Sequence, residues 1–169
     1  TKMKSEFKGS KLNIHMNKQK WEKSHPNYLV NMVNLVAYSI VGIDFDPDPM
    51  KLWIQIDKTG LVKTLPRRMD GAIPWTTNPK IVREIKEYYN TTTFWSRIAD
   101  GVYESMLVWE ELKSLKNNEW IKIHHVLFTD NYLTWWKQWR SYLCRFVDLV
   151  HMWLLDQVFF WKEVYTQRP

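Results

Sequence analysis

Apolar positions at helical spacing mark a first clear element between Tyr28 and Val41. These positions cover most of the circumference of a helix. Pro26-Asn27 lies just before the segment and Gly42 just after it, as is typical of the two ends of a helix. The pattern predicts a central helix that is buried on most sides.

The final third of the chain, from Tyr132 to about Gln167, is rich in tryptophan and contains neither proline nor glycine. Interior proline costs a helix about 3 kcal/mol and glycine about 1 kcal/mol, so this segment favours one long helix. Its apolar residues step by three and four, which is the spacing of a seam that docks onto a partner. The expected partner-docking residues are Trp136, Trp139, Leu143, Phe146, Val150, Trp153 and Trp161.

Alternating apolar and polar residues predict a small antiparallel sheet. Residues 51–65 have the pattern of a hairpin, and residues 119–128 that of a third strand. Asn78-Pro79 is typical of a helix start and predicts a short helix that ends near Tyr89. The expected fold class is therefore α+β and mostly helical, with a small antiparallel sheet packed on helices.

The formal charge of +6 is concentrated at the N-terminus, where residues 1–24 contain seven lysines and two glutamates. We expect a basic, flexible N-terminal arm over residues 1–24 and a single globular domain over residues 25–169. Such an arm suits nucleic-acid phosphate, anionic lipid or an acidic protein surface. The residues expected to make electrostatic contacts are Lys2, Lys4, Lys8, Lys11, Lys18, Lys20, Arg67 and Arg68.

Cysteine content and hydropathy bear on the compartment. Cys144 is the single cysteine, so an internal disulfide framework is excluded and an intracellular compartment is favoured. No segment is a convincing membrane span, because the best candidate, residues 28–43, is shorter than the roughly 20 apolar residues that a span needs. Contact with a membrane surface through the basic arm stays open.

Asp44, Asp46 and Asp48 alternate in a way that suggests a site for a hard cation. An EF-hand loop needs glycine at its sixth position and glutamate at its twelfth, where this chain has Pro49 and Gln55. An acidic turn before a strand is the simpler interpretation.

One nuclease arrangement consists of Pro-Asp followed, on the next strand, by an acid two places before a lysine. Pro47-Asp48 and Lys58 have a suitable order, but Ile56 stands where the acid must be. The pattern fails at this place.

Asp148 and His151 lie one helical turn apart, with Ser141 two turns before Asp148. No glycine-rich nucleophile turn accompanies them, so a structural pair is the simpler interpretation. The five histidines have no second ligand at a spacing typical of zinc sites. We therefore expect no catalytic residue, no metal site and no cofactor.

The excess of apolar helix surface favours a non-catalytic interaction subunit of a larger assembly. In this hypothesis the final helix docks another protein subunit and the basic arm contacts an acidic surface. One alternative is an RNA- or DNA-associated protein that uses the basic arm and exposed aromatic residues. Another is a small-molecule-binding domain or enzyme with a tryptophan-lined pocket, natural or designed.

Overall fold

The core of the protein is a four-stranded mixed sheet of order β3-β4-β5-β6. The computed structural model describes residues 5, 7–8, 10, 12–16, 26–42, 44–56, 60, 62–65, 67–87, 95–130, 133–138 and 140–160. The strands are β3 (Ala72–Ile73), β4 (Ile81–Lys86), β5 (His124–Thr129) and β6 (Gln157–Phe160). β4, β5 and β6 run parallel, and β3 pairs antiparallel with β4.

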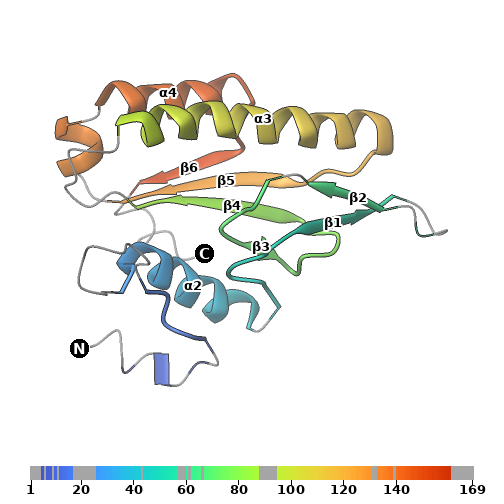
Figure 1. Cartoon of the computed structure of the whole chain (residues 1–169), viewed down its shortest axis with the longest axis horizontal. Helices are drawn as coiled ribbons and strands as arrows, with labels where there is room; N and C mark the ends of the chain where they lie inside the picture. The colour runs from blue at the N-terminus through green and yellow to red at the C-terminus, as the bar shows by residue number, and fades with distance from the viewer. Residues whose placement is uncertain are drawn as a thin grey trace.

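Helices cover both faces of this sheet (Figure 1). Parallel neighbours require crossover connections, and α3 (Trp95–Glu119) lies between β4 and β5 in the sequence. The π-helix η1 (Leu133–Gln138) and α4 (Arg140–His151) lie between β5 and β6. α3 and α4 share one face, whereas α2 (Tyr28–Val41) lies on the other, as Figure 1 shows.

Strand β4 is buried on both faces because successive side chains point to opposite sides of a sheet. Ile85 packs against Leu29 and Val33 of α2. Val82 belongs instead to the cluster that contains Leu112 of α3. Odd-numbered residues of β4 therefore face α2, and even-numbered residues face α3.

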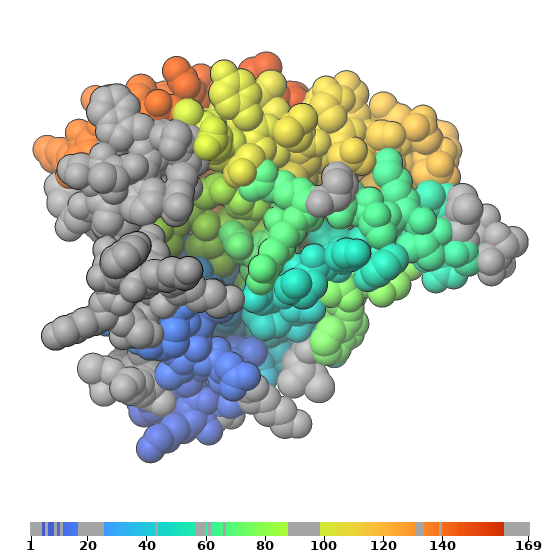
Figure 2. Space-filling model, in the orientation of Figure 1, coloured from blue at the N-terminus to red at the C-terminus, as the bar shows by residue number. Residues whose placement is uncertain are grey.

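The hairpin predicted over residues 51–65 is confirmed as β1 (Leu52–Gln55) and β2 (Val62–Leu65), which form a separate two-stranded sheet. Leu52 and Ile54 are fully buried, as the alternation requires. Lys63 of β2 forms an ion pair with Glu111 of α3 at 3.3 Å. The space-filling view in Figure 2 shows this hairpin region, in turquoise and green, lying below α3, in yellow.

The predicted fold class is wrong. The protein is mixed α/β, with about 45% helix and 24% strand in two sheets, and its longest helix is α3 rather than a C-terminal one. The larger sheet is mainly parallel, and the hairpin does not join it. The sequence pattern located several elements but not their pairing, which depends on contacts between distant segments.

The short helix predicted after Asn78-Pro79 is strand β4. Asn78 has a positive φ of 50°, and its Oδ1 accepts a hydrogen bond from Gln55 N at 2.7 Å. The asparagine therefore closes a turn against β1 instead of capping a helix. The β-branched residues that follow, Ile81 and Val82, favour a strand.

The prediction of one long helix from Tyr132 to about Gln167 is also wrong, because α4 ends at His151 and the chain returns to the sheet as β6. Trp153 has a positive φ of 60° in the reversal. Asp156 then fixes the start of β6, since its Oδ2 accepts a hydrogen bond from His125 N at 2.7 Å. The absence of proline and glycine permits a long helix, but these tertiary contacts decide against one.

The flexible arm predicted over residues 1–24 falls mostly outside the described residues and stays a prediction. Among those described, Phe7 is buried, and His15 N donates to Asn31 Oδ1 of α2 at 2.7 Å. Asn31 Nδ2 returns a hydrogen bond to His15 O at 2.9 Å. Of the helices in the described ranges, none has the length and apolar character that a membrane crossing requires.

The two aromatic residues of α4 and its C-terminal turn should differ sharply in their effect on stability. Phe146 is fully buried and meets the Trp135 ring edge-on at 5.7 Å, so Phe146→Ala should lower the free energy of unfolding by about 3–5 kcal/mol. Trp153 is 86% exposed, so Trp153→Ala should cost less than about 1 kcal/mol. Urea unfolding of both variants measures this, and equal losses would contradict the placement of α4.

Candidate active site at the carboxyl end of strand β4

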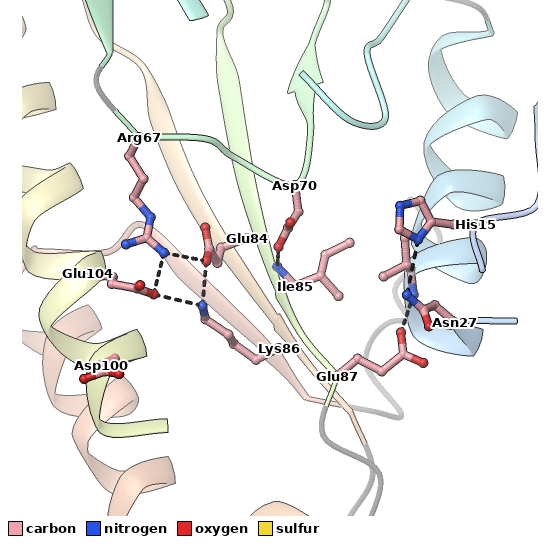
Figure 3. A pocket seen from close by; sticks show the side chains of 11 residues that line it. His15, Asn27, Arg67, Asp70, Glu84, Ile85, Lys86, Glu87, Asp100 and Glu104 are labelled. Atoms are coloured by element: carbon pink, nitrogen blue, oxygen red, sulfur yellow. Dashed lines mark hydrogen bonds and ion pairs between the residues drawn. The ribbon is translucent and has the colours of Figure 1, made fainter. Parts of the chain in front are cut away.

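A pocket of about 500 Å³ lies where β4 ends, between α3 on one side and α2 on the other (Figure 3). The carboxyl ends of parallel strands are the usual place for ligand sites in sheets covered by helices. Five carboxylates and two cationic side chains contribute to the lining. The lining residues are His15, Asn27, Val30, Arg67, Asp70, Glu84, Ile85, Lys86, Glu87, Asp100 and Glu104.

Glu84 and Lys86 form the buried centre of this pocket. They are two residues apart on β4, so both point to the α3 face, and Lys86 Nζ lies 2.5 Å from Glu84 Oε1. Gly101 of α3 leaves room for the lysine stem, because a Cβ at this position would stand 3.1 Å from Lys86 Cε. An interior glycine costs a helix about 1 kcal/mol, and this close approach explains its presence.

Two further charged groups extend the pair into a network that Figure 3 shows. Arg67, from the loop after β2, bonds to Glu104 of α3 and lies 3.2 Å from Glu84 Oε1. Lys86 Nζ lies 3.4 Å from Glu104 Oε2. Burial would raise the pKa of Glu104, but the hydrogen bond from Arg67 and the charge of Lys86 outweigh it and lower this pKa.

Asp70 approaches the same pocket from the loop before β3. Its backbone N donates to Arg83 O at 3.0 Å, and its Oδ2 accepts a hydrogen bond from Ile85 N at 2.8 Å. Burial and the nearby charge of Glu84 raise the pKa of Asp70 to about 6. Two carboxylates from neighbouring segments therefore repel each other across the end of β4.

A buried arginine holds the Asp70 loop. The Arg83 guanidinium donates to Asn34 Oδ1 of α2 and lies 5.3 Å from the centre of the Phe45 ring. Burial lowers the pKa of Arg83 to about 10, although the charge of Asp70 acts in the opposite direction. A Cβ on Gly71 would stand 2.0 Å from Arg83 Nε, so only glycine lets the guanidinium pass beside this loop.

Except for its proline, where this chain has Met69, the nuclease arrangement that fails at Asp48 and Lys58 is present at this site. Asp70 precedes the strand, and Glu84 stands two places before Lys86. Sequence reasoning missed this arrangement because residues 79–89 were expected to form a helix, where an acid and a lysine two apart do not face one another. The β-branched character of β4 was the available signal.

The predicted docking residues separate into two groups. Leu143 and Phe146 are buried in the chain's own core, and Val150 packs beside it. Trp136 and Trp153 are exposed, with the Arg140 guanidinium 4.8 Å from the Trp136 ring centre. Two predicted docking residues, Trp139 and Trp161, lie outside the described residues. Docking of a partner stays a prediction. The predicted residues that pack in the chain's own core are not exposed for such a contact.

The residues predicted for electrostatic contact are also dispersed. Arg67 lines the pocket, whereas Arg68 forms an ion pair with Asp48. Lys8 is exposed. The remaining predicted lysines lie outside the described residues, and they are Lys2, Lys4, Lys11, Lys18 and Lys20.

The other candidate groups from the sequence lie away from the pocket. Asp148 and His151 are exposed on α4. In the acidic turn, Asp46 Oδ1 accepts a hydrogen bond from Asp48 N at 2.9 Å. Within the described ranges, no three His, Cys, Asp or Glu side chains converge to bind a metal by themselves. This pocket is lined mainly by charged side chains, whereas one of the alternative functions called for a pocket lined by tryptophan.

His125 of β5 is a buried histidine whose two ring nitrogens have no hydrogen-bond partner in the described part of the chain. Burial lowers the pKa of His125 to about 4, against the opposing charges of Glu84 and Asp156. The imidazole is therefore held neutral beside the charged network.

This burial predicts a pH-dependent stability. Between pH 6.5 and about 4 the unfolded chain binds a proton at His125 that the folded chain does not, so the free energy of unfolding falls with decreasing pH. The expected loss is at most about 1.4 kcal/mol per pH unit. Urea unfolding at pH 7 and pH 5 should show a smaller pH effect in His125→Leu than in the wild type, and an unchanged effect would contradict the neutral buried state.

Comparisons with known proteins identify the family but no characterised relative. No curated protein and no solved structure matches the chain. The sequence matches a domain of unknown function, DUF7687, over residues 1–169. Because this match spans the whole chain, the protein belongs to the DUF7687 family.

Proposed function

We propose that this protein hydrolyses phosphodiester bonds of nucleic acid with the help of a divalent cation. The observation that carries the proposal is the convergence of Asp70, Glu84 and Lys86 on one pocket at the end of β4. This function departs from the non-catalytic one expected from the sequence. It develops the alternative of an RNA- or DNA-associated protein.

The donor set fits a hard cation such as Mg²⁺ or Mn²⁺. Carboxylate oxygens are preferred ligands of such ions, and Mg²⁺ is commonly bound by one or two carboxylates together with water and substrate phosphate oxygens. Asp70 and Glu84 would supply the two carboxylates. The raised pKa of Asp70 supports this fit, because a cation would relieve the repulsion from Glu84.

The charge balance also favours a cation. The chain carries +6 overall, which suits a polyanionic substrate. The pocket nevertheless has five carboxylates against Arg67 and Lys86. A bound cation would offset this excess of negative charge and would strengthen the binding of a substrate phosphate.

In this mechanism, a bound divalent cation would polarise the phosphate and stabilise the negative charge that develops in the transition state. Asp70 and Glu84 would hold the cation, and Lys86 would donate a hydrogen bond to a phosphate oxygen or to the attacking water. The attacking water loses a proton to the solvent as its oxygen bonds to phosphorus, the P–O ester bond breaks, and the leaving oxygen takes up a proton from the solvent. The Glu84 carboxylate, 2.5 Å from Lys86 Nζ, fixes the position of the lysine ammonium group.

Hydrolysis should depend on the three converging residues. With labelled DNA and RNA substrates and Mg²⁺ or Mn²⁺, Asp70→Asn, Glu84→Gln and Lys86→Met should each lower the cleavage rate by roughly 100-fold or more. The first two remove a carboxylate that would hold the cation, and the third removes the ammonium group that would contact the phosphate. Asp148→Asn is the matched control, since it removes an exposed carboxylate on α4 outside the pocket. Absence of cleavage by the wild type on both substrates would overturn the proposal.

Cation binding can be measured without catalysis. Because a ligand bound only by the native state raises the melting temperature, Mn²⁺ should raise that of the wild type and have a much smaller effect on Asp70→Asn. Asp44→Asn removes an exposed carboxylate of the acidic turn and should retain the full rise. A rise lost in Asp44→Asn and kept in Asp70→Asn would place the cation in the turn instead.

A further inference from the structure

Glu104 bridges both cationic side chains of the pocket. Its Oε2 bonds to the Arg67 guanidinium and lies 3.4 Å from Lys86 Nζ. Figure 3 shows the glutamate reaching across from α3 to the two basic groups, which come from a loop and from β4. One oxygen that contacts a guanidinium and an ammonium has the surroundings of a phosphate oxygen in a binding site.

The three acidic and basic partners are not equally fixed. The side chains of Glu84 and Lys86 are 8% and 9% exposed, whereas that of Glu104 is 36% exposed. Glu104 lies on the solvent side of the network and can turn outward into water. Glu84 is almost completely buried and has no such freedom.

Arg67 retains capacity for another acceptor. Its Nε is buried and has no hydrogen-bond partner among the described residues, and the same terminal nitrogen, Nη2, contacts both Glu84 and Glu104. A guanidinium binds phosphate through two parallel hydrogen bonds. The pairing with Glu104 thus satisfies this group less fully than a phosphate would.

We propose that Arg67 and Lys86 form a phosphate-binding subsite and that Glu104 occupies it in the free protein until a substrate phosphate displaces it. The identification of this phosphate as part of a nucleic acid rests on the proposed function. The subsite itself rests on the geometry of the three side chains. Glu104 acts as an internal competitor that selects for ligands with more negative charge than one carboxylate.

The inference predicts tighter phosphate binding when the competitor is neutralised. Glu104→Gln should bind a short fluorescent oligonucleotide in EDTA about tenfold more tightly than the wild type, because a close like charge opposes binding. Inorganic phosphate is small enough to contact this subsite alone. It should raise the melting temperature of Glu104→Gln at a concentration about tenfold lower than the wild type requires. Fluorescence anisotropy and thermal melting measure the two effects.

Asp100→Asn is the matched control. Asp100 is also acidic, lines the same pocket and lies one helical turn before Glu104 on α3. An equal gain in Asp100→Asn would show a general effect of pocket charge and would overturn the subsite. Adding Arg67→Gln to Glu104→Gln should remove the gain in phosphate affinity. A gain that persists in the double variant would also overturn the subsite.

A purely positioning role for Glu104 gives a different result. If Glu104 only orients Lys86, Glu104→Gln should lower kcat with no tighter binding of either probe, which overturns the inference. Failure of the proposed function is separate, since it is seen as absent cleavage by the wild type. Tighter phosphate binding by Glu104→Gln without any cleavage would keep the subsite and reject the hydrolase.

Discussion

The buried Arg83 guanidinium is the interaction on which the arrangement of the site depends. It donates to Asn34 Oδ1 and Val33 O of α2 and to Asp70 O in the loop before β3. A buried charge is costly unless such partners compensate it, so removal of any partner leaves a cation without sufficient acceptors. Three segments that are distant in sequence are thereby held together, and the Asp70 carboxylate takes its position from them.

Successive side chains of β4 point to opposite faces of the sheet, so one face of the strand has a structural role and the other a chemical one. Arg83 and Ile85 face α2 and anchor the helix and the loop, whereas Glu84 and Lys86 face α3 and enter the charged network. A parallel neighbour, β5, buries the strand on its other edge. Charged side chains are therefore held in a low-dielectric setting at the strand end, where their interactions are strong and their geometry is fixed.

The sequence predicts local elements of this fold better than its pairing. Helix α2 and the β1-β2 hairpin follow from spacing and turn residues, because their defining contacts are close in the chain. Strand β4 was missed because Asn78-Pro79 has the sequence of a helix start. The hydrogen bond from Gln55 that makes Asn78 part of a turn comes from a residue far away in the sequence. The candidate site was missed with β4, since Glu84 and Lys86 face one another only in a strand. Arg67 was predicted only as a charge for electrostatic contact, and Glu104 was not predicted at all, because the packing of α3 and of the loop after β2 brings the two together.

The close approach of Arg83 to Gly71 has a consequence for sequence variation. A side chain at position 71 and a full-length arginine at position 83 exclude each other, because the added Cβ would overlap the guanidinium. A shorter residue at position 83 would in turn leave Asn34 without its donor. Positions 34, 71 and 83 are therefore expected to covary in related chains, so that a change at one is tolerated only together with changes at the others.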